Sequence, residues 1–208
     1  MADAALPLDI WSNFYVIIGS SAGGLTGLTF VVIALIADQT AVRLPGLRAF
    51  ITPTIVHFCS VLAIAAVLNV PGQTPFSVAL CLAAAGLIGV IYSIGTALKL
   101  NSSQPEYVPV AADWIWNVVL PTLSYLVLLM AGALAFSHAP IALYVTAGVS
   151  LLLLFIGIHN AWDIAVWFTA ERPAQQRQAA APPEPPPVPA ATAPPATAPS
   201  TTAPSAKR

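Results

Sequence analysis

The chain has 208 residues, of which 58% are hydrophobic and 7% are charged, and its formal net charge is −1. Ordinary soluble domains carry roughly 25% charged residues. So few charges cannot cover a water-facing surface, whereas a lipid-facing surface needs none. The composition therefore excludes a soluble enzyme and gives no electrostatic reason to expect nucleic-acid binding.

Five apolar stretches are long enough to cross about 30 Å of hydrocarbon. They predict an all-α integral membrane bundle of five transmembrane helices, at about 12–37, 50–70, 75–98, 113–138 and 141–168. Pro53 and Pro75 are expected in first helical turns, where a missing N–H costs little. Pro121 falls within the fourth stretch and predicts a kink. The organisation expected is a short external N-terminus (1–11), a transmembrane domain (12–171) and a tail (172–208).

The basic residues predict an orientation, because Lys and Arg in short loops are retained on the cytoplasmic side. They fall in the first and third loops and after the last helix: Arg43, Arg48, Lys99, Arg172, Arg177, Lys207 and Arg208. Five alternating helices place all seven on one face only if the N-terminus lies outside and the C-terminus in the cytoplasm.

The tail at 172–208 is rich in Pro, Ala and Thr and predicts a disordered cytoplasmic segment with polyproline-II bias. Two interpretations stay open. The tail is a solvated chain, or PPEPPPVP (182–189) is a docking strip for a reader of proline-rich motifs.

The first helix carries the sequence GSSAGGLTG, in which Gly19, Gly23 and Gly27 recur at every fourth position, with Ser20 and Gly24 beside them. In lipid, close backbone approach decides helix association, so this glycine zipper is a packing surface. It contacts another helix of the same chain, makes a homo-oligomer or binds a partner's membrane helix. A glycine-lined pore is a further interpretation.

A polar cluster in the last helix, HNAWD, places His159, Asn160 and Asp163 on one face. His57 in the second helix has a similar expected depth. Other polar residues of the same half are Ser60, Tyr92, Ser93, Thr96, Asn117 and Ser124. Ionisable groups within a membrane helix are costly, and two reasons for their presence stay open: interhelical hydrogen bonds, or a proton relay in which Asp163 orients His159 and His57 completes the path.

The sequence gives no reason to expect a metal or another cofactor, because the three histidines and two cysteines lack ligand spacing. It also contains no HExxH motif, no P-loop and no GxSxG nucleophile elbow at a strand-to-helix turn, so no catalytic activity is expected.

The stretch NFYVIIGSSAGGLTGLTFVVIALIAD (13–38), together with HNAWD, resembles an uncharacterised family of small multi-pass bacterial inner-membrane proteins, some of which are labelled as modulators of a membrane protease. The resemblance covers most of the membrane region and not the tail. It implies a location in the bacterial inner membrane and supplies no catalytic residues.

The function expected is therefore helix–helix association in the lipid bilayer, as a homo-oligomer or as an accessory subunit of another membrane protein. The alternative is a small proton-coupled transporter or channel that uses His57, His159, Asn160 and Asp163.

Overall fold

The computed structural model describes residues 8–39, 45–101 and 110–166, with the backbone alone for 35–39 and 45–50. Across these ranges the chain is all α, without a strand. The elements are α1 (Leu8–Gln39), α2 (Pro45–Leu68), α3 (Pro75–Asn101), α4 (Ala111–Trp114), the π-helical turn η1 (Ile115–Val119), α5 (Leu120–Leu134) and α6 (Ala139–Val166). α4, η1 and α5 follow one another without a break, so the described chain forms five long helical rods.

Five segments are long and apolar enough to cross a membrane, with mean hydropathies between 1.8 and 2.4: Leu8–Ala34, Ile51–Leu68, Pro75–Asn101, Ala111–Leu134 and Ala139–Val166. The shortest has 18 residues and covers about 27 Å at 1.5 Å per residue. The prediction of five membrane-length helices is confirmed, and this is the organisation of a multi-pass membrane protein. The tail at 172–208 and residues 1–7 lie outside the described residues, while α1 already begins at Leu8.

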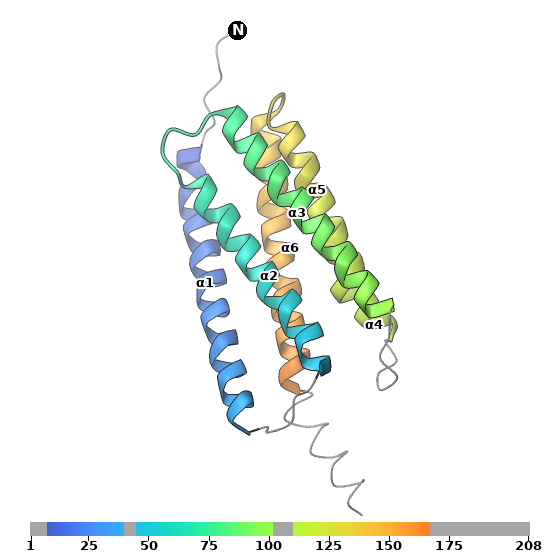
Figure 1. The fold of residues 1–208 in the computed structure, drawn as a ribbon. Helices are drawn as coiled ribbons and strands as arrows, with labels where there is room; N and C mark the ends of the chain where they lie inside the picture. Colours follow the sequence, from blue (N-terminus) through green and yellow to red (C-terminus); the bar gives the residue numbers. More distant parts are fainter. Residues whose placement is uncertain (1–7, 40–44, 102–109, 167–208) are drawn as a thin grey trace, which may run out of the picture.

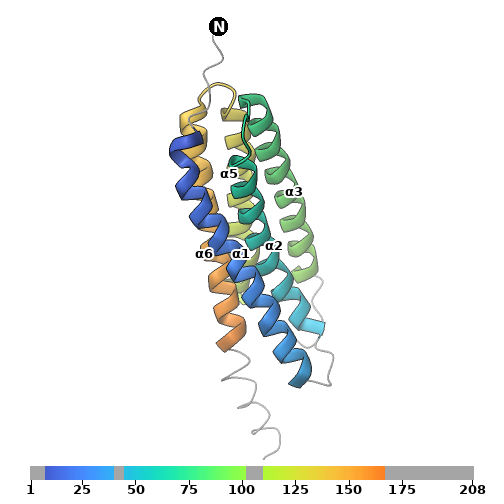
Figure 2. The same cartoon turned by 90° about the vertical axis from the view of Figure 1, so that its left-hand side faces the viewer.

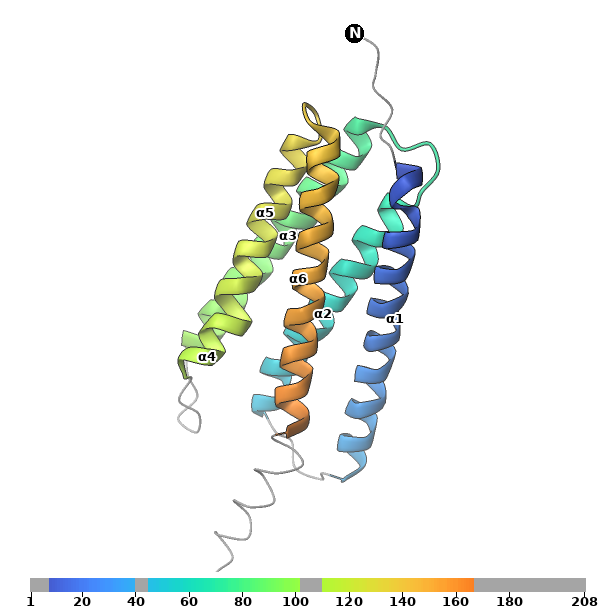
Figure 3. The ribbon, with the colours of Figure 1, turned by 180° about the vertical axis from the view of Figure 1, so that it is seen from behind.

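The helices alternate in direction along the bundle (Figure 1). α1, α3 and α6 end at the same end of the bundle at which α2 and α4 begin. α1 packs on α2, α3 packs on α5, and α6 contacts both α2 and α5. The view from behind shows α6 between these two pairs, and the side view shows α1 on the outside of the bundle (Figures 2 and 3).

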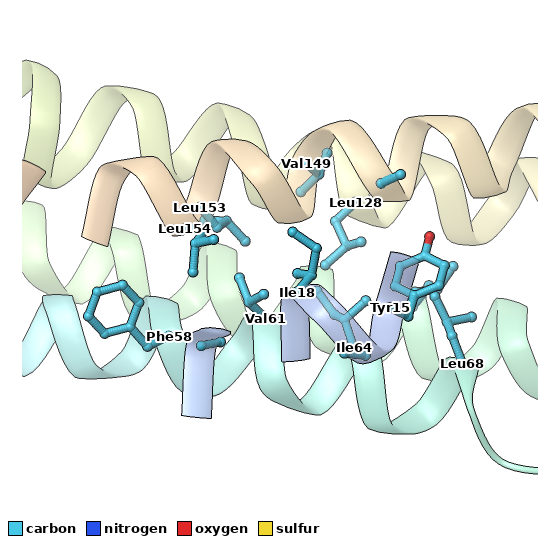
Figure 4. Close-up of a cluster of buried hydrophobic side chains, with 14 of the residues drawn as sticks. Tyr15, Ile18, Phe58, Val61, Ile64, Leu68, Leu128, Val149, Leu153 and Leu154 are labelled. Atoms are coloured by element: carbon cyan, nitrogen blue, oxygen red, sulfur yellow. The ribbon is translucent and has the colours of Figure 1, made fainter. Parts of the chain in front are cut away.

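The core of the bundle is built mainly from α2 and α6, with smaller contributions from α1, α3 and α5 (Figure 4). Phe58, Leu128 and Leu153 are fully buried in it. Large apolar side chains also face outward, among them Ile88, Leu98 and Met130, each about two-thirds exposed. An outward apolar surface needs no polar cover when lipid surrounds it.

The connection between α2 and α3 is a tight turn. Gly72 has a φ of 71°, in the left-handed region that other residues rarely adopt. The Ser77 N–H donates to Oγ1 of Thr74 at 3.1 Å, which caps the start of α3. Pro75 is the first residue of α3, as predicted from its tolerance of first-turn positions.

Two prolines lie within helical segments. The prediction that Pro53 lies in a first turn is wrong, because α2 begins at Pro45 and continues through Pro53. Pro45 itself suits the start of a helix, and a helix in lipid continues through a proline because unwound backbone would lack hydrogen-bond partners. Pro121 follows the π-helical turn η1, in which the Leu120 N–H donates to the Ile115 carbonyl, five residues earlier.

Candidate functional site

The histidines of α2 and α6 belong to two separate groups of polar contacts. The first, the core network, consists of Val56, His57 and Ser60 on α2 and Tyr125 on α5. The second, the terminal cluster, lies where α6 ends and where the α4–η1–α5 rod begins. Its members are Asp113, Trp116, Asn117, His159, Asn160 and Asp163.

The core network joins α2 to α5 through two polar contacts, both to the Tyr125 hydroxyl. His57 is 1% exposed, and its Nδ1 lies 3.0 Å from the Tyr125 hydroxyl oxygen. The same hydroxyl lies 3.0 Å from Oγ of Ser60, and Ser60 donates to the Val56 carbonyl at 2.8 Å. His57 and Ser60 are three residues apart, so both face α5 from one side of α2.

The terminal cluster contains an ion-pairing couple at the rim of the bundle. Nε2 of His159 lies 3.1 Å from Oδ2 of Asp163, one turn further along α6. The His159 ring stacks on Trp116, with centroids 3.7 Å apart and planes 25° apart. The side chains of His159 and Asp163 are 33% and 61% exposed, respectively. An exposed pair of this kind contributes little to stability, so its role is local orientation of the imidazole.

Two buried amides connect α6 to η1 beside that couple. Nδ2 of Asn160 donates to Oδ1 of Asn117 at 3.3 Å, and Nδ2 of Asn117 donates to the Asp113 carbonyl at 3.2 Å. Both amides are less than 10% exposed. The π-helical turn carries Asn117, so the distorted segment before Pro121 positions this interhelical bond.

His57 and His159 contact different partners, although α2 and α6 lie against each other close to both residues. A Cβ added at Gly157 of α6 would meet the ring of Phe58, so these two turns are in contact. Tyr125 and Trp116, the partners of the two imidazoles, are nine positions apart along one rod, roughly 13 Å at 1.5 Å per residue. Hydrogen bonds and ring contacts place His57 in the core network and His159, Asn160 and Asp163 in the terminal cluster.

Two glycines of the strip on α1, Gly19 and Gly23, lie against α2 of the same chain. A Cβ added at Gly19 would lie 2.8 Å from Cβ of Ala65 on α2, too close for a relaxed structure. A Cβ added at Gly23 would lie 3.9 Å from Cδ1 of Leu62, which is ordinary van der Waals contact. Gly19 therefore allows α1 to approach α2 closely, and Gly23 lies at the edge of that contact.

The other two glycines of the strip, Gly24 and Gly27, have no described residue packed against them. A Cβ added at Gly24 or Gly27 would meet nothing within 4 Å. Ser20, Gly24, Gly27 and Val31 are all exposed and share one side of α1, because their spacings are four, three and four residues. These four residues are the outer face of α1.

The closest helix approach lies elsewhere, between α3 and α5. A Cβ added at Gly86 would lie 2.7 Å from Cα of Leu129, and one added at Gly132 would lie 2.7 Å from the Ala83 backbone nitrogen. A Cβ at Gly89 would collide with the Tyr125 ring. Sequence reasoning missed this contact, although the small residues of AAAGLIG (83–89) were a readable signal.

Tyr125 was also missed as a polar partner. A tyrosine in the middle of an apolar stretch needs a partner for its hydroxyl, and this was the signal that could have identified it. The two hydroxyls that follow Pro121 bond locally: Thr122 donates to the Val118 carbonyl at 2.6 Å and Ser124 to the Leu120 carbonyl at 2.8 Å.

Two open grooves on the described part of the bundle have mainly apolar linings that include neither the core network nor the terminal cluster. One of about 510 Å³ runs along α5 past Leu123, Val127 and Met130. Another, of about 290 Å³, lies between Phe76 on α3 and Phe136. In the described ranges, no three His, Cys, Asp or Glu side chains come together to hold a metal ion.

Comparison of the chain with protein-family models, with curated proteins and with solved structures finds no match in any of the three. The resemblance of 13–38 and HNAWD to a bacterial inner-membrane family therefore stays a prediction. The helices themselves identify the chain as a multi-pass α-helical membrane protein.

Proposed function

We propose that this protein acts through helix association in the bilayer, with the outer face of α1 as its contact surface. The observation that supports this is the unequal burial of the helices. In the most apolar stretch of α1, 17% of the residues are buried, against 56% in α6. Among the five membrane-length helices, α1 is thus the one that the described residues cover least.

The composition of the outer face favours a helix as its occupant. Glycine within a helix costs roughly 1 kcal/mol relative to alanine, and no described residue lies within 4 Å of a Cβ added at Gly24 or Gly27. Lipid tails gain nothing from a backbone exposed to them. A second helix does gain, because close approach maximises van der Waals contact where hydrophobic drive is weak.

The proposed setting is the bacterial inner membrane, with the N-terminus outside and the tail in the cytoplasm. The alternation of the helices supports this orientation together with the charge bias. Arg43 lies between α1 and α2, Lys99 lies in the last turn of α3, and Arg172 follows α6. The helix that packs on the outer face of α1 belongs to another copy of this chain or to another membrane protein, which the chain serves as an accessory subunit.

The test uses Gly24→Leu/Gly27→Leu and a matched control. Gly148 on α6 is also exposed, and a Cβ there would meet nothing within 4 Å, so Gly148→Leu adds the same bulk elsewhere. Native gels of detergent-solubilised membranes are expected to show an assembly for the wild type and Gly148→Leu, and the monomer for the α1 variant. An α1 variant that keeps the wild-type size would contradict the proposal.

Energy transfer between labelled copies of the purified protein in liposomes separates the two kinds of occupant. Transfer that is lost in Gly24→Leu/Gly27→Leu assigns the face to a second copy. Absence of transfer, with an assembly still present in native membranes, assigns it to a different protein.

Proton-coupled transport is the second candidate, and the burial of His57 in the core network favours it. Nε2 of this imidazole has no hydrogen-bond partner among the described residues, and the lone pair of a neutral imidazole can accept a proton. Proteoliposomes should then show a pH-dependent flux that His57→Gln and Asp163→Asn abolish. His138→Gln is the matched control because His138 is exposed in the α5–α6 connection. Full flux in both test variants would remove these residues from the mechanism.

A further inference from the structure

Two buried polar atoms lack a hydrogen-bond partner within the described residues: Nε2 of His57 and Oγ of Ser93. Each residue is 1% exposed. Buried polar atoms in folded proteins are nearly always paired, with protein groups or with ordered water. Two such atoms in one bundle therefore require a physical explanation.

The hydrogen atoms of the core network follow from its donor count. Ser60 has one O–H and lies 2.8 Å from the Val56 carbonyl, which can only accept, so Ser60 donates to Val56. The Ser60 oxygen then accepts the O–H of Tyr125 at 3.0 Å. Because Tyr125 has no second hydrogen, its oxygen accepts the Nδ1–H of His57 at 3.0 Å. Neutral His57 therefore presents a bare lone pair at Nε2.

Ser93 presents the complementary group. The hydroxyls of Ser60, Thr96 and Ser124 each donate to the carbonyl four residues earlier in the same helix. Oγ of Ser93 makes no such bond. Its O–H is therefore a donor that the helix backbone does not use, while Nε2 of His57 is an acceptor.

His57 and Ser93 lie on the two helices that pack against Tyr125 and its neighbouring turn. His57 is bonded to the Tyr125 hydroxyl. Gly89 lies against the Tyr125 ring, and Ser93 follows one turn later on the same side of α3. α3 and α5 run in opposite directions, so Ser93 falls beside the turn that precedes Tyr125, where Pro121 lies. α2 also packs directly on α3.

We propose that α2, α3 and α5 form a buried binding site for a single water molecule, which donates to Nε2 of His57 and accepts from the Ser93 hydroxyl. A buried water makes about three hydrogen bonds. Pro121 has no N–H, so a carbonyl in the preceding turn lacks its helical donor and can accept the water's second hydrogen. This site is independent of association through α1.

The groups favour water over a metal ion. A free acceptor facing a free donor matches a molecule that donates and accepts at once. A metal ion would need several His, Cys, Asp or Glu ligands, and the described part of the chain gathers no three of them.

The full chain in liposomes, with ¹⁵N-labelled histidine, tests the site by solid-state NMR. The chain has three histidines, and His57→Gln identifies the His57 signals. We expect a hydrogen on Nδ1, none on Nε2, and magnetisation transfer from water protons to Nε2. A hydrogen on Nε2, or absence of transfer from water, would overturn the site.

Ser93→Ala and Ser150→Ala test the second partner. Ser150 is equally buried, but its hydroxyl donates to the Thr146 carbonyl, so its loss leaves the proposed site intact. Transfer from water to Nε2 should be lost in Ser93→Ala and unchanged in Ser150→Ala. Unchanged transfer in Ser93→Ala would remove Ser93 from the site. The wild-type spectrum decides the presence of water even if Ser93→Ala does not fold.

Discussion

The contact between α3 and α5 and the outer face of α1 both carry glycines at helical spacing, and they differ in what surrounds those glycines. At Gly86, Gly89 and Gly132 an added Cβ would collide with backbone or with a ring of the neighbouring helix. At Gly24 and Gly27 it would meet nothing within 4 Å. The first set allows α3 and α5 to pack closely, whereas the second lies on a surface that no described residue covers.

This difference teaches that glycine spacing predicts a packing surface without identifying the partner. Gly19 illustrates the point, because it belongs to the same strip as Gly27 and yet lies against Ala65. The sequence pattern is continuous along α1, but α2 covers only one side of that helix. The following substitutions test the distinction from the most to the least disruptive position.

Gly86→Ala should be the most damaging. The new methyl group would lie 2.7 Å from Cα of Leu129, and backbone cannot move aside as a side-chain tip can. Overpacking of this kind typically costs 1–3 kcal/mol, so we expect a loss of about 2 kcal/mol in the free energy of unfolding. SDS titration followed by circular dichroism measures it. Gly148→Ala, with open space around it, is the control, and equal behaviour of the two variants would contradict the close α3–α5 contact.

Gly19→Ala should have an intermediate effect of about 1 kcal/mol, because one methyl group meets one other methyl group at 2.8 Å. Ala65→Gly removes the opposing group. The double variant should therefore be more stable than the sum of the two single losses predicts, and a double-mutant cycle in the same titration measures this coupling. Additive losses would mean that Gly19 and Ala65 do not touch.

Gly27→Ala should have the smallest effect and the opposite sign. Alanine reduces the entropy of the unfolded chain and meets no obstacle here, so the monomer should gain about 0.5 kcal/mol. The measurement is made in a detergent that keeps the protein monomeric. A clear loss of monomer stability would show that a part of the chain covers this face.

The polar groups could be predicted only in part. The spacing of His159 and Asp163 on one helix is fixed by sequence, and the two side chains do meet at 3.1 Å. His57 was named from its depth, but its partner Tyr125 lies 68 positions away, and no local pattern connects them. Likewise, Pro121 predicts a disturbed helix, whereas the Asn117–Asn160 bond depends on α6 lying beside that segment.

The sequence by itself determined that the chain forms five membrane-length helices, because apolar length and proline or glycine breaks act locally and lipid requires every backbone group to bond within its own helix. Only the tertiary structure decided which glycines lie against a neighbour, which imidazole is buried and which polar atoms remain unpaired. These properties depend on the rotation and pairing of the helices, and in a uniformly apolar bundle the sequence pattern of one helix does not specify which side faces which neighbour.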